Sequence, residues 1–278
     1  MTYAAPRNVP DALAALAAPE ARILAGGTDF YPALGDRPLD FPIVDVTRIA
    51  ELRGITETAE GWRVGAAVTW SDLVRADLPP LFDGLKAAAR EIGAIQIQNT
   101  ATLAGNLCNA SPAADGVPVL LTLDAQVEIA SPRGMRRLPL DAFITGVRDT
   151  ALTTGEIMTA IFVPRHNTQA RSAFLKLGAR RYLVISIAMV AAVLEADDCG
   201  TITTARVAVG ACSAVATRLA ALEVALEGSR LTALSAIPRQ EHLAPLAPID
   251  DVRAPAMYRN TAALELIRRT LAVAGRSP

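Results

Sequence analysis

The amino-acid sequence predicts a mixed α and β fold in two unequal parts. Short apolar runs of strand length alternate with alanine-rich helical segments along the chain of 278 residues. Hydrophobic residues make up 51% of the chain, which is enough for two hydrophobic cores. The pattern changes after a polar tract at residues 166–170. We therefore expect one domain at residues 1–168 and a second at residues 169–278.

In the first part, Pro10 and Asp11 favour the start of a first helix, and Thr69 with Asp72 form a capping signal for another. The expected helices cover residues 11–18, 30–34, 70–75 and 81–92. The expected strands cover residues 21–25, 42–46, 52–58, 62–68, 126–131, 136–140 and 156–163. Two pairs of these strands, at residues 52–68 and 126–140, are typical of β-hairpins.

Several segments are less regular. Residues 96–109 show no helical or strand period, so we expect a polar, glycine-bearing loop, and residues 116–123 form an apolar segment. In the second part, residues 172–177 and 185–195 fit a strand or a helix equally well. The expected elements that follow are a strand at residues 206–211, an amphipathic helix at residues 216–227 and a long helix at residues 255–274.

The charge balance excludes some functions. With 27 basic and 28 acidic residues the chain has no electrostatic footprint for nucleic acid or an anionic membrane. The longest apolar stretch, residues 182–194, is too short to span a bilayer, which needs about 20 residues. No signal-peptide pattern is visible at the N-terminus, so we expect a cytoplasmic protein.

Residues that could bind metal are scarce. The three cysteines (Cys108, Cys199 and Cys212) are scattered and form no C-x-x-C pair, which excludes a disulfide scaffold and an iron–sulfur site in this chain. We expect them to be buried small hydrophobic side chains. The two histidines, His166 and His242, are expected to face solvent. We expect no catalytic side chain and no metal site, so redox chemistry would need an organic cofactor.

Two glycine-bearing segments carry the candidate site. Gly26 and Gly27 follow a strand, and glycines there let the backbone approach a ligand such as a phosphate. The second segment contains Gly105 and Asn106 and leads to Ser111 and Asp115, which could meet sugar hydroxyls. A Gly-Gly pair after a strand is, by itself, more often only a tight turn. Neither segment is a dinucleotide-binding G-x-G-x-x-G sequence or a P-loop.

These segments resemble the paired flavin-binding loops of the FAD subunit in the molybdenum hydroxylase family. That family includes xanthine dehydrogenase, aldehyde oxidoreductases and the medium subunit of carbon monoxide dehydrogenase. Residues 25–29 match its A-G-G-T-D/S loop, and residues 102–106 and 110–115 match T-I/L-G-G-N and A-S-P-x-x-D, with Ala104 in place of the first glycine. Further pieces follow in the family's order at residues 123–125, 138–143, 176–181, 250–253 and 258–259.

The resemblance implies a two-lobed FAD-binding domain of the vanillyl-alcohol-oxidase-like (PCMH) type, followed by a smaller α+β domain like that of carbon monoxide dehydrogenase flavoproteins. It implies that Asp115 binds ribityl or ribose hydroxyls, that Lys176 lies near the pyrimidine edge of the flavin, and that Ile185 lies near its ring. The FAD-binding residues that it implies are Ile23, Leu24, Ala25, Gly26, Gly27, Thr28, Asp29, Phe30, Ile92, Thr102, Leu103, Ala104, Gly105, Asn106, Ser111, Asp115, Met158, Lys176 and Ile185.

The resemblance also implies an FAD-dependent oxidoreductase subunit inside a complex. A large partner would carry molybdopterin and oxidise the substrate, and a small partner would carry two [2Fe–2S] clusters. This chain would pass electrons from the clusters to FAD and on to NAD, oxygen or another acceptor, in a dimer of heterotrimers. Two alternatives stay open: a self-contained FAD-dependent oxidase or reductase, and a scaffold subunit without flavin.

Overall fold

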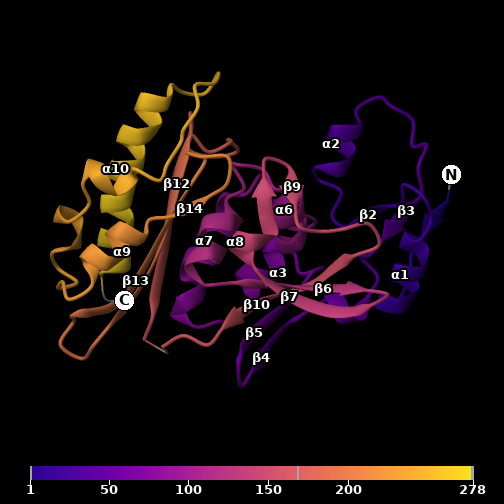
Figure 1. Cartoon of the computed structure of the whole chain (residues 1–278), viewed down its shortest axis with the longest axis horizontal. Helices are drawn as coiled ribbons and strands as arrows, with labels where there is room; N and C mark the ends of the chain where they lie inside the picture. Colours follow the sequence, from indigo (N-terminus) through magenta and orange to yellow (C-terminus); the bar gives the residue numbers. More distant parts are fainter. Residues whose placement is uncertain (1, 168, 277–278) are drawn as a thin grey trace.

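The computed structural model describes residues 2–167 and 169–276. Three bodies follow one another along the long axis, with the N-terminus at one end and the C-terminal helix at the other (Figure 1). They are a small N-terminal lobe, a central lobe and a C-terminal domain. The predicted domain boundary falls at residue 168, outside the described residues, and it stays a prediction.

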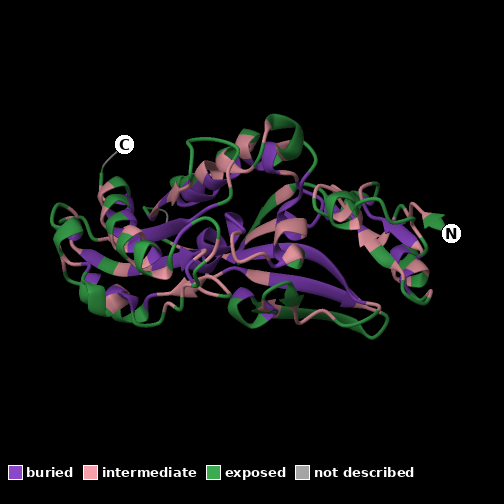
Figure 2. Cartoon of the chain, turned by 90° about the horizontal axis from the view of Figure 1, so that it is seen from above, coloured by how far each residue is buried: buried purple, intermediate pink, exposed green. Residues whose placement is uncertain are grey.

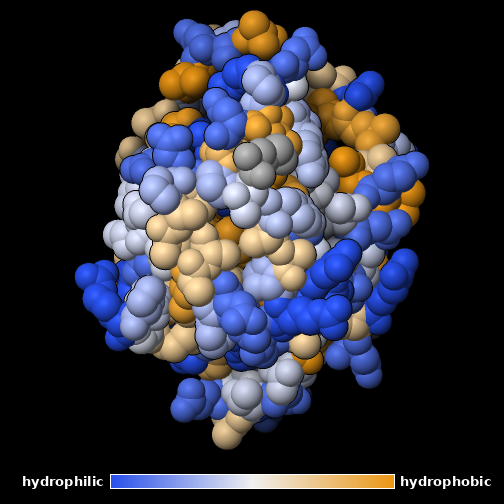
Figure 3. Space-filling view, turned by 90° about the vertical axis from the view of Figure 1, so that its right-hand side faces the viewer, coloured by the Kyte–Doolittle hydropathy of each residue, from blue (hydrophilic) through white to orange (hydrophobic). Residues whose placement is uncertain are grey.

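The N-terminal lobe is built on a small parallel sheet. Its strands are β1 (Tyr3–Ala4), β2 (Arg22–Leu24) and β3 (Ile43–Asp45), in the order β1-β3-β2. Helix α1 (Val9–Leu16) begins earlier than expected because the side chain of Asn8 caps it by accepting from the Asp11 amide. Helix α2 (Phe30–Leu34) has the predicted bounds. Figure 3 faces this end of the molecule, where hydrophilic and hydrophobic residues lie side by side.

The central lobe contains a five-stranded antiparallel sheet. Its order is β4 (Ile55–Thr58), β5 (Gly61–Gly65), β10 (Ile157–Pro164), β6 (Gln126–Ser131) and β7 (Gly134–Pro139). Both predicted hairpins are confirmed as β4-β5 and β6-β7. The helices of this lobe are α3 (Trp70–Arg75), α4 (Asp83–Glu91), α5 (Ile95–Gln98), α6 (Leu103–Asn109), α7 (Gly116–Thr122) and α8 (Leu140–Phe143). A short pair, β8 (Ile144–Gly146) and β9 (Asp149–Thr150), follows α8.

One expectation for this lobe was wrong. Residues 96–109 do not form a loop, because they hold most of α5 and the whole of α6. Thr102 caps α6, since its hydroxyl accepts from the Gly105 amide at 2.9 Å. Small and polar residues in α6 hid its helical period. At α3 the predicted capping box between Thr69 and Asp72 is confirmed.

The C-terminal domain is an antiparallel sheet covered by two helices. The strands are β11 (Arg171–Leu177), β12 (Ala188–Ala196), β13 (Ile202–Gly210) and β14 (Thr217–Arg218), in that order. The helices are α9 (Ala220–Leu226) and α10 (Ala256–Ala274). Helix α9 starts later than expected because residues 217–218 pair with β13 as β14.

Strand β12 is buried on both faces. Met189, Ala191 and Val193 belong to the large core shared with the central lobe, whose helices α4 and α7 contact this sheet. The alternating residues Val190 and Leu194 belong to the second core under α9 and α10. Figure 2 shows the buried residues running through both the central lobe and this domain. A strand buried on both faces loses its alternating pattern, which is why its sequence fitted a helix equally well.

Three expectations about single residues are corrected by the structure. Cys108 and Cys199 are exposed, and only Cys212 is buried. Burial raises the pKa of the Cys212 thiol to about 11. The His166 ring is only 3% exposed, with Nε2 2.9 Å from the Leu123 carbonyl oxygen, so it does not face solvent. No helix in the described part of the chain has the length and hydrophobicity of a membrane span.

Candidate functional site

The first glycine loop joins β2 to α2, and its two glycines are required for different reasons. Gly27 has a φ of +72°, a left-handed conformation, and a Cβ there would lie 2.8 Å from the Tyr31 ring. A Cβ on Gly26 would lie 2.0 Å from the carbonyl oxygen of Thr100. The backbone at Gly26 therefore touches the backbone of a distant segment, and no side chain fits between them.

This contact brings the two predicted segments together. Thr100 and Ala101 directly precede Thr102, which caps α6, so the loop at Gly26 lies against the entrance to the second segment. The second segment is fixed from the other side by the backbone bonds Trp70 N to Ala101 O, at 3.2 Å, and Leu103 N to Val68 O, at 3.1 Å. Two segments about seventy residues apart in sequence are thus in direct backbone contact.

Asn106 supplies an unsatisfied polar atom at this surface. Its Oδ1 is buried and has no hydrogen-bond partner among the described residues. A Cβ on Gly116 would lie 3.0 Å from this oxygen and 2.6 Å from the Trp70 ring. Ser111, nearby in sequence, accepts from the Ala113 amide at 3.3 Å. A buried amide oxygen without a partner is uncommon and favours a missing donor such as a bound ligand.

A second group of polar side chains joins the two domains. Asp115, at the start of α7, accepts from Lys176 Nζ at 2.7 Å and from Ser186 Oγ at 2.6 Å. All three side chains lie out of solvent, with Lys176 only 7% exposed. Burial raises the pKa of the Asp115 carboxyl, and the charge of Lys176 with the two hydrogen bonds opposes that rise. Lys176 also donates to the Val184 carbonyl oxygen at 3.2 Å.

The other predicted residues come from further elements. Ile92 is half-buried just after α4, and Met158 is buried in β10 beside an irregularity in the pairing with β6. Ile185 is 52% exposed on the segment between β11 and β12, next to the exposed Leu183. A cavity of about 360 Å³ lies between α4 and the end of β11, and Lys176 is one of its lining residues.

Sequence reasoning missed two features of the site. Ser186 was not a candidate, although a serine inside the apolar run 182–194 is the kind of signal that marks a buried hydrogen bond. For Arg259, the sequence showed only that residues 258–259 resemble a closing element of the family. In the structure Arg259 is 3% exposed and pairs with Asp251 at 2.6 Å, while Arg253 pairs with the same carboxylate at 2.9 Å. The two closing sequence elements of the resemblance thus contact each other.

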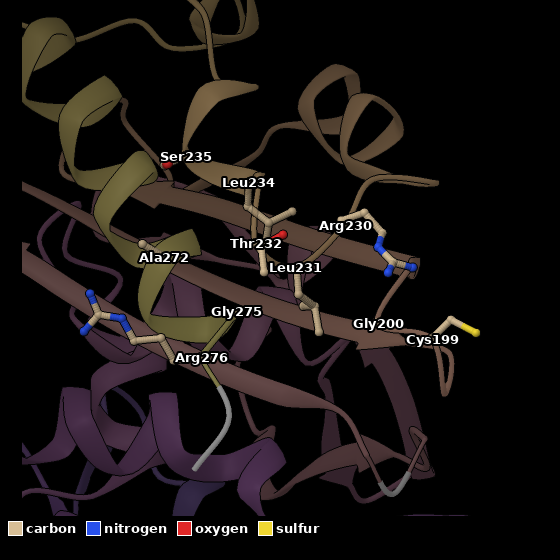
Figure 4. Close-up of a pocket in the computed structure, with 10 residues that line it drawn as sticks. All are labelled: Cys199, Gly200, Arg230, Leu231, Thr232, Leu234, Ser235, Ala272, Gly275 and Arg276. Carbon is tan, nitrogen blue, oxygen red and sulfur yellow. The ribbon is translucent and has the colours of Figure 1, made fainter.

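A larger cavity lies away from these groups, in the C-terminal domain. It measures about 620 Å³ and lies between the β12-β13 connection and the end of α10. Figure 4 shows that its two arginines, Arg230 and Arg276, point in different directions and not toward a common centre. None of the predicted FAD-binding residues lines it, so we do not assign the candidate site there.

Comparison with known proteins gives the class that this architecture represents. Residues 1–166 match the family model described as the FAD binding domain in molybdopterin dehydrogenase. Residues 173–274 match the model described as the CO dehydrogenase flavoprotein C-terminal domain. The chain is therefore an FAD-dependent oxidoreductase subunit with two family domains in the predicted order. It belongs to the family of FAD-binding subunits of molybdenum hydroxylases, as the resemblance implied.

Individual relatives agree with this family. The chain is 35% identical to the xanthine dehydrogenase FAD-binding subunit of Escherichia coli O157:H7, with 92% of this chain and 91% of the relative covered. It is 33% identical to the nicotine 6-hydroxylase medium subunit of Paenarthrobacter nicotinovorans, covering 98% and 96%. Its fold is similar to a chain in the structure of carbon monoxide dehydrogenase from Hydrogenophaga pseudoflava, with a TM-score of 0.87, 29% identity and coverage of 99% and 96%.

Proposed function

We propose that this chain is the FAD-binding electron-transfer subunit of a molybdenum hydroxylase complex. It takes electrons from [2Fe–2S] clusters on a small partner subunit and passes them to NAD, oxygen or another acceptor. A large partner subunit carries molybdopterin and oxidises the substrate. The complex is a dimer of heterotrimers located in the cytoplasm. The family, together with relatives that are subunits of multi-subunit enzymes, supports this proposal.

The observation that carries the proposal is the backbone contact between Gly26 and Thr100. It shows that two loops, each rich in small residues, lie in backbone contact, and this supports a role for their backbone N–H groups in binding a pyrophosphate. The buried Asn106 oxygen offers an acceptor for a ligand hydroxyl or N–H. This donor and acceptor set fits FAD, whose phosphates, sugar hydroxyls and ring edge need each of these contacts.

The remaining predicted residues have distinct roles in this proposal. Residues 23–30 and 102–106 hold the pyrophosphate and adenosine side. Lys176 places a positive charge near the flavin pyrimidine edge, while Ile92, Met158 and Ile185 give apolar contacts that keep water from the ring. When bound, FAD supplies the two-electron and one-electron redox chemistry. The protein contributes orientation and local charge, and no side chain of this chain needs to act as an acid or base.

Because Asp115 already accepts from two protein donors, its predicted contact with ribityl or ribose hydroxyls would use its remaining lone pairs. A carboxylate has about four such acceptor positions, so both roles are compatible.

The first experiment is the absorption spectrum of the purified chain together with a glycine variant. The wild-type chain should show the absorption bands of oxidised flavin. Gly27→Val should abolish flavin retention, because Gly27 has a positive φ and its Cβ would meet the Tyr31 ring. Gly35→Val is a matched control. Gly35 also has a positive φ, but nothing lies within 4 Å of its Cβ, and flavin should be retained.

Three outcomes test the proposal against its alternatives. If the wild-type chain shows no flavin bands after incubation with FAD, the chain is better explained as a scaffold subunit without flavin. Flavin content in Gly27→Val equal to that of the wild type would contradict the loop assignment. Purification from the native host tests the complex. If no molybdenum subunit and no iron–sulfur subunit accompany the chain, the self-contained oxidase or reductase is favoured.

A further inference from the structure

Ser186 belongs to the polar group around Asp115, and the family resemblance did not imply a role for it. Ser186 is 2% exposed, and its hydroxyl lies 2.6 Å from Asp115 Oδ1. The other carboxylate oxygen, Oδ2, accepts from Lys176 Nζ at 2.7 Å. Each oxygen of Asp115 therefore has a single side-chain donor among the described residues: Lys176 lies near the end of β11, and Ser186 lies in the segment that links β11 to β12.

The geometry fixes which way the hydroxyl proton points. A carboxylate can only accept, so Ser186 must donate to Asp115. The same segment is held at Val184, whose carbonyl oxygen accepts from Lys176. Lys176 thus uses two of its three N–H donors inside the protein, and one donor remains for a ligand. Lys176 is also one of the residues that line the cavity between α4 and β11.

We propose that Ser186 is a positioning residue of the flavin site, which holds Asp115 so that Asp115 in turn fixes the ammonium group of Lys176. This inference rests on the proposed function, because it concerns how the chain places charge beside bound FAD. Without the hydroxyl, Oδ1 of Asp115 would be buried with no donor, which is costly for a charged oxygen. The carboxyl group would then rotate away from its present position, and Lys176 would lose its fixed partner.

The consequence for the cofactor follows from the sign of the charge. A cation near the flavin stabilises the reduced, anionic form more than the neutral oxidised form. Ser186 should therefore raise the flavin midpoint potential and strengthen FAD binding through Lys176. The effect on potential separates this role from a purely structural one, since loss of packing alone changes stability and leaves the preference between the two flavin forms unchanged.

The test uses the full chain with Ser186→Ala and Ser186→Cys. Cysteine nearly keeps the size of serine but is a weak donor, so it preserves packing while weakening the hydrogen bond. Ser172→Ala is the matched control. Ser172 lies in β11, where its hydroxyl accepts from the Gly84 amide at 2.8 Å and donates to the Pro80 carbonyl oxygen, and it makes no hydrogen bond to Asp115. Measurements are the FAD dissociation constant by titration, the midpoint potential, and thermal unfolding of the apo chain.

We expect both Ser186 variants to bind FAD about tenfold more weakly, as for loss of a hydrogen bond to a charged group. The balance between reduced and oxidised flavin should shift about tenfold toward the oxidised form, which is about 30 mV to lower potential. Ser172→Ala should keep the wild-type potential. If the wild-type chain binds no FAD, the proposed function fails. If the wild type binds FAD but Ser186→Cys keeps its potential, or does not fold, the inference alone is overturned.

Discussion

Gly26→Ala is the sharpest test of the surface that joins the two glycine loops. The added Cβ would lie 2.0 Å from the Thr100 carbonyl oxygen, 2.6 Å from its carbonyl carbon and 2.9 Å from the Ala101 Cα. All three atoms are backbone, so no side chain can rotate away. The two segments must separate by about 1 Å to reach even the closest contacts that proteins tolerate.

The expected cost follows from overpacking. Forcing one methyl group into a filled space typically destabilises a protein by about 1–3 kcal/mol. We therefore expect the free energy of unfolding of the apo chain to fall by about 2 kcal/mol in urea titrations. FAD affinity should fall by more than about tenfold, because displaced loops cannot keep both sets of backbone N–H groups in place.

The matched control is Gly54→Ala. Gly54 has a φ of +81°, but nothing lies within 4 Å of its Cβ, so this variant tests backbone strain without crowding. It should lose some stability and keep the wild-type FAD affinity. Wild-type stability and wild-type affinity in Gly26→Ala would refute the reasoning, because they would mean that the two loops do not touch as described.

Two further predictions concern partly buried ion pairs. Arg206→Met should destabilise the chain by about 2 kcal/mol in urea titrations, because Glu195, which is only 13% exposed, loses the arginine that pairs with it at 2.8 Å, while Asp124 keeps its pair with Arg218; an unchanged midpoint would contradict this. A hydrogen bond from Arg136 is the main cause that lowers the pKa of Glu156 from 4.5 to about 2, so Glu156 stabilises the folded chain above pH about 4.5 and loses this contribution as pH falls toward about 2. In Glu156→Gln the thermal unfolding temperature should therefore fall less between pH about 4.5 and about 2 than it does in the wild type. An equal fall in both proteins would show that this pair does not govern acid stability.

Much of the fold could be predicted because local signals were strong. The capping box of Thr69 and Asp72 fixed the start of α3, and alternating patterns with turn residues located the β6-β7 hairpin. Thr102 caps α6 in the same way, but the third helical position is Gly105 and no acidic residue completes the signal. The sequence of this helix therefore favours a loop.

The site was predicted only as two separate sequence segments. Their contact at Gly26 and Thr100 depends on how β2 and α5 are placed by the rest of the chain, which no local pattern encodes. His166 shows the same limit. Its polar surroundings in sequence indicated exposure, but the ring is covered because it reaches Leu123, 43 positions away, and lies 3.6 Å from Glu195. Long-range tertiary contacts overrode the local composition at both places.

Because β12 is buried on both faces, we expect the two family domains to depend on each other for stability. Its Met189, Ala191 and Val193 face the central lobe, so cutting the chain between the domains would expose an apolar sheet face with no partner. Such a face favours aggregation over independent folding. The sheet of the C-terminal domain thus completes the hydrophobic core of the central lobe. We expect the chain to unfold in one cooperative transition, in which loss of this domain is coupled to loss of the proposed flavin site.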